Sequence, residues 1–207
     1  KYVEHFTSGP PSQAPEVVEL LAWRSILFDL DLIGCDPDRY DGAGFGNASA
    51  RFKSSDGRKG RRRFLVTGTQ TGHLRSLDSR HIAVVDQYDL AANKVVASGP
   101  VHPSSEVLTH GAVYDHCDDV RWIFHAHSPV IWLRRTELDL PTTRPQVPYG
   151  TPAMALEVGR LFAECRLRQR RIFAMGGHQD GIVSFGDTAA EAGALMIALL
   201  ARARALG

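Results

Sequence analysis

Two histidines, His125 and His127, are separated by one residue within a short apolar run. If this run forms a β-strand, residues i and i+2 point to the same face, so both imidazoles project together. Two imidazoles on one face could be ligands of a single metal ion. The same spacing is more often found in ordinary polar strand residues. A metal site therefore requires further ligands from elsewhere in the chain.

Two other residues could complete such a site. His178 lies within the glycine-rich run 176–181, which predicts a turn residue rather than a core residue. It could supply a third imidazole, although a turn histidine without a chemical role is an equally good interpretation. Glu106 follows two serines at the expected start of a helix and could face the metal as a ligand or a base. The simpler interpretation is an acidic first turn, which the helix dipole favours.

Three segments carry glycine, hydroxyl or amide groups of the kind that allow close contact with a phosphate. The first precedes Glu106 at a helix start, where hydroxyls and free N–H groups can bind an anion or simply cap the helix. The other two are 44–51 and 67–72, and neither has the Gly-Lys-Ser/Thr ending of a Walker loop. Either could be an ordinary turn.

The composition excludes several classes of protein. Of the 207 residues, 43% are hydrophobic and 23% charged, which is typical of a globular protein and argues against disorder. The formal net charge is only +1, and the basic run 58–63 is more typical of a solvated hairpin than of a nucleic-acid site. The longest nearly apolar stretch, 192–201, is too short to span a bilayer. We therefore expect no nucleic-acid or membrane partner.

The three cysteines indicate a reducing environment. Cys35, Cys117 and Cys165 are far apart and form no Cys-x-x-Cys motif, so neither a disulfide framework nor a cysteine zinc site is predicted. The first ten residues contain no apolar core of the kind found in a secretory signal. The expected location is the cytoplasm.

Helices and short strands must position these candidate residues. Helices are predicted from residue 15 to Gly34, over 105–116 and 152–168, and from Thr188, where Thr188-x-x-Glu191 fits a capping box. Strands are predicted at 50–52, 64–66, 82–88, 94–97, 122–127, 172–175 and 182–185, with hairpin turns at 54–60 and near 92–93. Residues 1–14 are expected to form a flexible arm, and residues 15–207 a single domain. This pattern predicts an α/β sandwich with a mixed sheet.

The motifs in their order along the chain resemble the class II aldolase/adducin family. The matching residues, spread over about 14–201, are Gly46-Asn47-x-Ser49-x-Arg51, Thr71-Gly72, Ser104-Ser105-Glu106, His125-x-His127 and His178. The family includes fuculose-phosphate and rhamnulose-phosphate aldolases, ribulose-phosphate 4-epimerases and methylthioribulose-phosphate dehydratases. The resemblance implies a three-layer α/β/α sandwich around a mixed, largely antiparallel sheet, and a homotetramer with active sites between subunits.

The resemblance also implies a role for each candidate residue. His125, His127 and His178 would bind zinc, although manganese, iron, cobalt and nickel also suit such ligands. Glu106 would be a fourth ligand in the resting site, or the acid/base once substrate displaces it. A substrate phosphate would be held by Asn47, Thr71, Gly72, Ser104 and Ser105, with Thr67-Gly68 as the less favoured alternative to Thr71-Gly72.

The implied function is a zinc-dependent lyase for a small phosphorylated sugar or related polyhydroxy carbonyl compound. Aldol cleavage would pass through a metal-stabilised enediolate, a route that an epimerase or a dehydratase could share. A non-catalytic module like the adducin head is a further alternative, which the complete set of candidate ligands disfavours.

Two departures from the family pattern bear on the reaction. No tyrosine lies between His127 and Tyr149, where the aldolases carry a catalytic one, and Tyr149, Glu137 or Asp139 could substitute. Asp180, two residues after His178, could orient that histidine or approach the metal.

Overall fold

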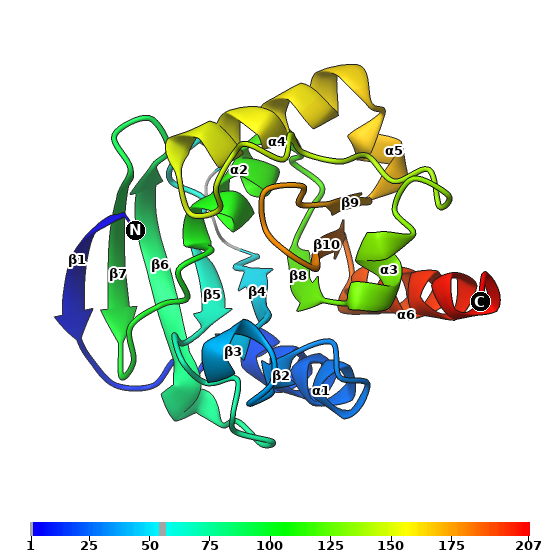
Figure 1. The fold of residues 1–207 in the computed structure, drawn as a ribbon. Helices are drawn as coiled ribbons and strands as arrows, with labels where there is room; N and C mark the ends of the chain where they lie inside the picture. The colour runs from blue at the N-terminus through cyan, green and yellow to red at the C-terminus, as the bar shows by residue number, and fades with distance from the viewer. Residues whose placement is uncertain (1, 54–56) are drawn as a thin grey trace.

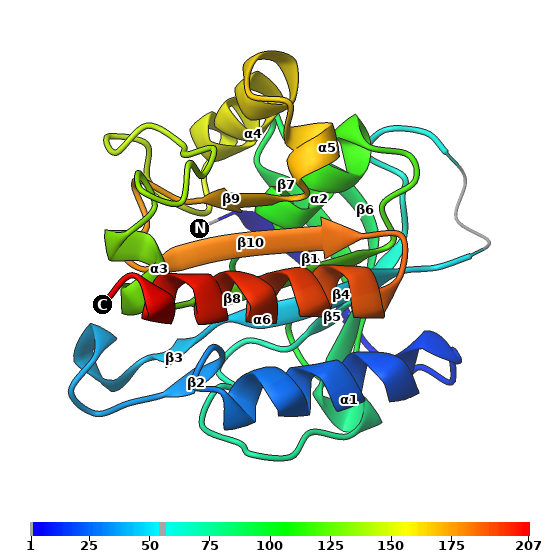
Figure 2. The ribbon, with the colours of Figure 1, turned by 90° about the vertical axis from the view of Figure 1, so that its right-hand side faces the viewer.

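The computed structural model describes residues 2–53 and 57–207, which form one large sheet flanked by helices (Figures 1 and 2). The sheet has eight strands in the order β1-β7-β6-β5-β4-β8-β10-β9, and every neighbouring pair is antiparallel except β1 and β7. The strands are β1 (Val3–Ser8), β4 (Asn47–Arg51), β5 (Phe64–Thr67), β6 (Ile82–Asp89), β7 (Lys94–Gly99), β8 (Trp122–His127), β9 (Ile172–Ala174) and β10 (Gly181–Gly186). A separate short pair consists of β2 (Gly34–Cys35) and β3 (Gly44–Phe45).

Side chains that alternate along the strands divide the apolar core into two layers. In β8, Ile123 packs in one layer, while Phe124 and Ala126 pack in the other. Helices α2 (Val107–His116), α4 (Pro152–Glu164) and α5 (Leu167–Arg170) cover the first layer, and α1 (Glu16–Asp29), α3 (Pro129–Leu133) and α6 (Ala189–Ala205) cover the second (Figure 1). The predicted α/β fold with a mixed, largely antiparallel sheet is confirmed, and helices lie on both of its faces.

The predicted strands and the capping box agree with the structure. Strand β8 has the predicted bounds, β6 and β7 form the predicted hairpin, and β4 pairs with β5. The predicted turn at 54–60 lies partly outside the described residues, since 54–56 are not described. At the start of α6, the Thr188 side chain accepts from the Glu191 N–H and the Glu191 carboxylate accepts from the Thr188 N–H.

Three helices are shorter than predicted. Helix α1 ends at Asp29 rather than near Gly34, because Asp31 adopts a left-handed conformation (φ 57°) and the chain turns toward β2. Helix α4 ends at Glu164, because Arg166 (φ 52°) interrupts the helix before α5. Helix α2 begins at Val107, two residues after its predicted start, because a turn around Ser104 precedes it.

The N-terminal segment differs from the flexible arm that the sequence predicted. Residues Val3–Ser8 form β1, an edge strand whose backbone pairs in parallel with β7. None of the six side chains of this strand is fully buried, so backbone hydrogen bonds to β7 hold it in the sheet. It was missed from the sequence because such a strand has no pattern of buried apolar residues. The preceding Tyr2 hydroxyl donates to the carbonyl oxygen of Ser104 (3.0 Å). That the remainder, 15–207, is a single domain stays a prediction.

Among the residues that the structure describes, no helix combines the length and apolar character needed to cross a membrane. Cys35, Cys117 and Cys165 are free thiols, and Cys117 is buried.

Gly193 allows α6 to pack against α1 through the ring of Trp23. A Cβ atom at Gly193 would lie 2.1 Å from Cζ3 of Trp23, far inside contact distance. We expect Gly193→Ala to lower the free energy of unfolding by about 1–3 kcal/mol, because an extra methyl group displaces packed side chains. Urea denaturation measures this change. Gly57→Ala is the control, since a Cβ there meets nothing within 4 Å. Equal losses in both variants would contradict the prediction.

Candidate active site

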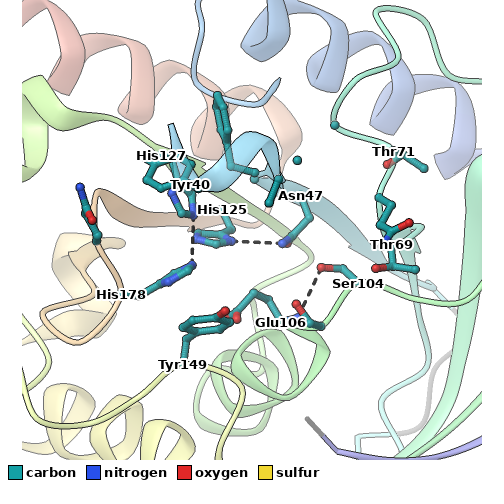
Figure 3. A pocket seen from close by; sticks show the side chains of 18 of the residues that line it. Tyr40, Asn47, Thr69, Thr71, Ser104, Glu106, His125, His127, Tyr149 and His178 are labelled. Atoms are coloured by element: carbon teal, nitrogen blue, oxygen red, sulfur yellow. Dashed lines mark hydrogen bonds between the residues drawn. The ribbon is translucent and has the colours of Figure 1, made fainter. Parts of the chain in front are cut away.

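The three predicted histidines come together on the face of the sheet covered by α2 and α4 (Figure 3). His125 and His127 lie at the end of β8, and His178 lies in the turn between β9 and β10. Antiparallel pairing places Gly181 opposite His127 and so brings this turn beside the end of β8. The Nε2 atoms of His127 and His178 are 3.0 Å apart, and one ligand atom from each histidine lies within 4.8 Å of the others. This spacing suits three ligands of one ion.

Burial determines the charge of these imidazoles. It lowers the pKa of His127 to about 2, with a contribution from His178, and it lowers the pKa of His178 to about 4. Burial also holds the pKa of His125 well below its ordinary value. All three rings are therefore neutral at physiological pH, which is the form that binds a metal.

Asn47 contacts His125 directly. It begins β4, opposite His125 in the register with β8, and its Nδ2 lies 3.1 Å from Nδ1 of His125. A carboxamide can present either its oxygen or its nitrogen to the ring. If Oδ1 accepts from Nδ1–H, the buried Nε2 of His125, which has no partner among the described residues, keeps its lone pair for a metal. Asn47 is thus placed to orient a candidate ligand as well as to line the cavity.

Glu106 is buried in the same cavity but lies outside the group of candidate ligands. Its Oε2 accepts a hydrogen bond from the Thr109 hydroxyl (2.9 Å), whereas Oε1 has no partner within the described part of the chain. Burial raises the pKa of Glu106 to about 7, although the Thr109 bond opposes the shift. This geometry favours the acid/base role over that of a fourth ligand.

A cavity of about 320 Å³ connects the histidines with the predicted phosphate residues. Figure 3 shows the histidines at one end, Thr69, Thr71 and Ser104 at the other, and Glu106 and Tyr149 between them. All of the predicted phosphate residues line it, namely Asn47, Thr71, Gly72, Ser104 and Ser105. Any side chain at position 72 would clash, since a Cβ there would lie 2.3 Å from the Gly34 carbonyl oxygen. The turn can therefore pack against β2 and β3 only with glycine at position 72.

The structure favours Thr71-Gly72 over Thr67-Gly68 as the phosphate turn. The Thr67 hydroxyl accepts from the Ala48 N–H (3.1 Å) within the sheet, and Thr67 does not line the cavity. Thr71 lines the cavity, and its hydroxyl donates to the Gly68 carbonyl (2.9 Å).

Of the three residues considered as substitutes for the aldolase tyrosine, only Tyr149 lines the cavity within the described residues. Its ring centroid lies 4.0 Å from that of His178. Asp139 is exposed and paired with Arg170, and Glu137 is also exposed. We therefore drop Glu137 and Asp139 as candidates.

A second group beside the histidines was not predicted from the sequence. The Tyr40 hydroxyl donates to Oδ2 of Asp180 (2.5 Å) and accepts from Nη2 of Arg39 (2.7 Å), and the Tyr40 ring lies 4.8 Å from that of His127. Burial and the bond to Asp180 raise the pKa of Tyr40 to about 12. The Asp180 carboxylate thus binds Tyr40, while its predicted contact with His178 is not formed. No local pattern marks this group, because Tyr40 and Asp180 are far apart in the sequence.

Comparison with known proteins agrees with this fold and site. The model of the family described as "Class II Aldolase and Adducin N-terminal domain" matches residues 37–206. The chain belongs to this family. The resemblance read from the sequence motifs is therefore confirmed, although a search of curated proteins gave no match for this class II aldolase family member.

Solved structures of similar fold include several aldolases. L-fuculose-1-phosphate aldolase from Thermus thermophilus is 22% identical with a TM-score of 0.63, and the alignment covers 92% of this chain and 91% of that one. Sugar-phosphate aldolase from Thermotoga maritima is 17% identical with a TM-score of 0.65, covering 92% of each chain. YgbL from Escherichia coli, a putative aldolase/epimerase/decarboxylase, is 20% identical with a TM-score of 0.63, and the alignment covers 92% of this chain and 87% of that one. At such identities the similarity establishes the shared fold.

The low pKa values of the buried histidines predict how this family member would lose a metal. A bound divalent ion should be retained as the pH falls through about 6.5, the ordinary pKa of histidine. Release is expected only near pH 4, where protonation of His178 begins to compete with the metal. Metal content after dialysis at successively lower pH, with circular dichroism to verify folding, measures this. Release from folded protein near pH 6.5 would contradict the prediction.

Proposed function

We propose that this protein is a zinc-dependent lyase that cleaves a small phosphorylated sugar, or a related polyhydroxy carbonyl compound, in the aldol sense. The observation that carries the proposal is the arrangement of one cavity. Three neutral imidazoles, two buried and one half-buried, lie at one end, and glycine and hydroxyl groups lie at the other. Membership of the class II aldolase family supports the same conclusion.

The donor set fits a divalent metal. His125, His127 and His178 offer three neutral nitrogen ligands and leave a further position open, as catalytic zinc sites do. The unpartnered Nε2 of His125 and the close Nε2 atoms of His127 and His178 are what such a site requires before an ion binds. When bound, the ion would supply Lewis-acid stabilisation of negative charge developing on a substrate oxygen. Zinc suits this set best, although other divalent transition metals fit it as well.

Glu106 is the proposed acid/base. A pKa of about 7 allows the carboxyl to take up and return a proton at neutral pH, which is the condition for efficient proton transfer. Its Oε1, buried and without a partner among the described residues, is the atom available for that proton. Tyr149 lies against His178 and is the proposed donor of the proton that the enediolate fragment takes up after cleavage.

The opposite end of the cavity is proposed to hold the substrate phosphate. Ser104, Ser105, Thr71 and Gly72 supply hydroxyl and backbone groups there, and Asn47 lies between them and the histidines. Anchoring the phosphate fixes the distance from it to the reacting carbons. A substrate held in this way pays less entropy on reaching the transition state.

Epimerisation or dehydration at the same site is the second candidate function. It is favoured by the absence of a tyrosine between His127 and Tyr149, where the aldolases place their proton donor. The non-catalytic alternative is disfavoured by the three clustered histidines, which an assembly module would not need.

The assembly proposed from the family resemblance is a homotetramer. Tyr149 is 49% exposed at the cavity, and Leu156 on the neighbouring α4 is 77% exposed. A subunit interface there would shield both from water. Light scattering measures the mass in solution, and a monomer would contradict this proposal while leaving the metal site unaffected.

The function is tested by loading purified protein with zinc and incubating it with a panel of ketose phosphates. Mass spectrometry identifies cleavage by two fragments and dehydration by the loss of one water. Chromatographic separation of the sugar isomers identifies epimerisation, which leaves the mass unchanged. Bound zinc with no turnover of any ketose phosphate would count against the lyase, the epimerase and the dehydratase together.

A further inference from the structure

Arg24 is a buried arginine that binds the turn carrying Thr71 and Gly72. It lies on α1 with only 1% of its surface exposed, and it does not line the cavity. Its Nη1 donates to the Arg75 carbonyl (2.8 Å), and its Nη2 donates to the carbonyls of Thr71 (3.1 Å) and Gly72 (3.4 Å). One guanidinium thus fixes three peptide groups of this turn.

The charge of Arg24 has no acidic partner within ion-pair distance among the described residues. The Phe28 ring lies 4.7 Å from the guanidinium carbon, and the nearby Asp29 pairs with Arg75 instead. Burial lowers the pKa of Arg24 to about 10, so the side chain still carries its charge at neutral pH. A buried cation without a counter-charge is costly, and an anion bound close by would offset that cost.

The hydrogen bonds of Arg24 also set the direction of the amide groups. In a trans peptide unit the N–H points away from the C=O, so carbonyls that face Arg24 turn the N–H groups of Gly72 and His73 the opposite way. Neither N–H forms a hydrogen bond within the described part of the chain. Gly72 is buried and lines the cavity, whereas His73 is exposed and does not line it. The unpaired N–H of Gly72 is therefore the group of this turn that can bind an anion in the cavity.

We propose that Arg24 is a positioning residue that makes this turn selective for a phosphate group. It holds the carbonyls of Thr71 and Gly72 away from the cavity, presents the Gly72 amide to a dianion, and adds a buried positive charge behind that amide. The inference rests on the proposed function, because it assigns an anion to the end of the cavity opposite the histidines. It concerns a residue of α1 that touches neither substrate nor metal.

The test is the binding of inorganic phosphate to the zinc-loaded full chain, measured by calorimetry. Arg24→Met should weaken phosphate binding about tenfold or more while zinc binding at the histidines stays unchanged, because hydrogen bonds that orient a charged group are strong. Arg24→Lys keeps the charge, but an ammonium group lacks the planar, forked donors that bind several carbonyls at once. We therefore expect its loss of phosphate affinity to lie between those of wild type and Arg24→Met. Arg80→Met is the control, since Arg80 is exposed, pairs with Asp78 and lies outside the cavity.

A second measurement keeps the proposal testable if Arg24→Met does not fold. Titration of isotope-labelled wild-type protein with phosphate should shift the Gly72 amide resonance strongly. Phosphate bound by wild type without a shift of this resonance, or bound equally by folded Arg24→Met, would overturn the role of Arg24. Wild type that binds zinc but no phosphate would instead overturn the phosphate end of the proposed function and, with it, this inference.

Discussion

His127→Ala should leave the protein folded but unable to retain a divalent ion, and should lower lyase activity by about a thousandfold or more. Among the described residues, the side chain supplies one of three clustered imidazoles, and its Nε2 is 3.0 Å from that of His178. Two remaining ligands hold an ion weakly, and the Lewis acid contributes several kcal/mol to the transition state. Metal content per chain by mass spectrometry and kcat/KM measure the two effects.

The matched control for this variant is His102→Ala. His102 is exposed, lies against Glu4 and does not line the cavity. The control should keep the zinc content and activity of wild type. Full zinc occupancy in folded His127→Ala would show that the histidine cluster is not the metal site.

Glu106→Gln should lower kcat by about a hundredfold to ten-thousandfold while zinc content stays unchanged. Glutamine keeps the size of the side chain but cannot accept and return a proton, and general acid–base catalysis contributes about that factor. Zinc should remain because Glu106 lies outside the three-histidine group. With Glu106 as the base, wild-type activity should rise as the pH increases through about 7, the raised pKa of this carboxyl. The variant should lose that rise.

Glu164→Gln is the control for the carboxylate variant, since Glu164 is exposed on α4 and pairs with Arg160. Loss of zinc from folded Glu106→Gln would assign the carboxylate to the metal as a ligand. Unchanged kcat with zinc present would remove Glu106 from the proton transfer.

The parts of the site that follow a backbone repeat could be predicted from the sequence. The two-residue period of a strand puts His125 and His127 on one face, and β8 has the bounds that its apolar run predicts. That the proposed phosphate residues line one cavity could be expected only from the family resemblance, since Asn47, Thr71 and Ser104 come from three separate segments. No periodicity relates them.

The parts that were missed depend on contacts between distant segments or on single backbone conformations. The hydrogen bond between Tyr40 and Asp180 joins two segments that are far apart in the sequence. The guanidinium of Arg24 likewise donates to the turn at Thr71, which lies far from α1 in the sequence. The early ends of α1 and α4 depend on left-handed residues, Asp31 and Arg166, whose types do not require that conformation. Contacts between segments far apart in the sequence determine the first two features, and single backbone conformations determine the helix ends, so residue type alone predicts none of them.

The parallel pairing of β1 with β7 gives the site an order of assembly. Val3 pairs with Lys94, so β1, which precedes β7 along the chain, can join the sheet only after β7 has been synthesised. Tyr2, just before β1, then supports the Ser104 carbonyl at the edge of the cavity. Closing so long a loop is slow compared with forming the hairpin of β6 and β7. The segment around Ser104 should therefore gain protection from hydrogen exchange later during refolding than the hairpin does.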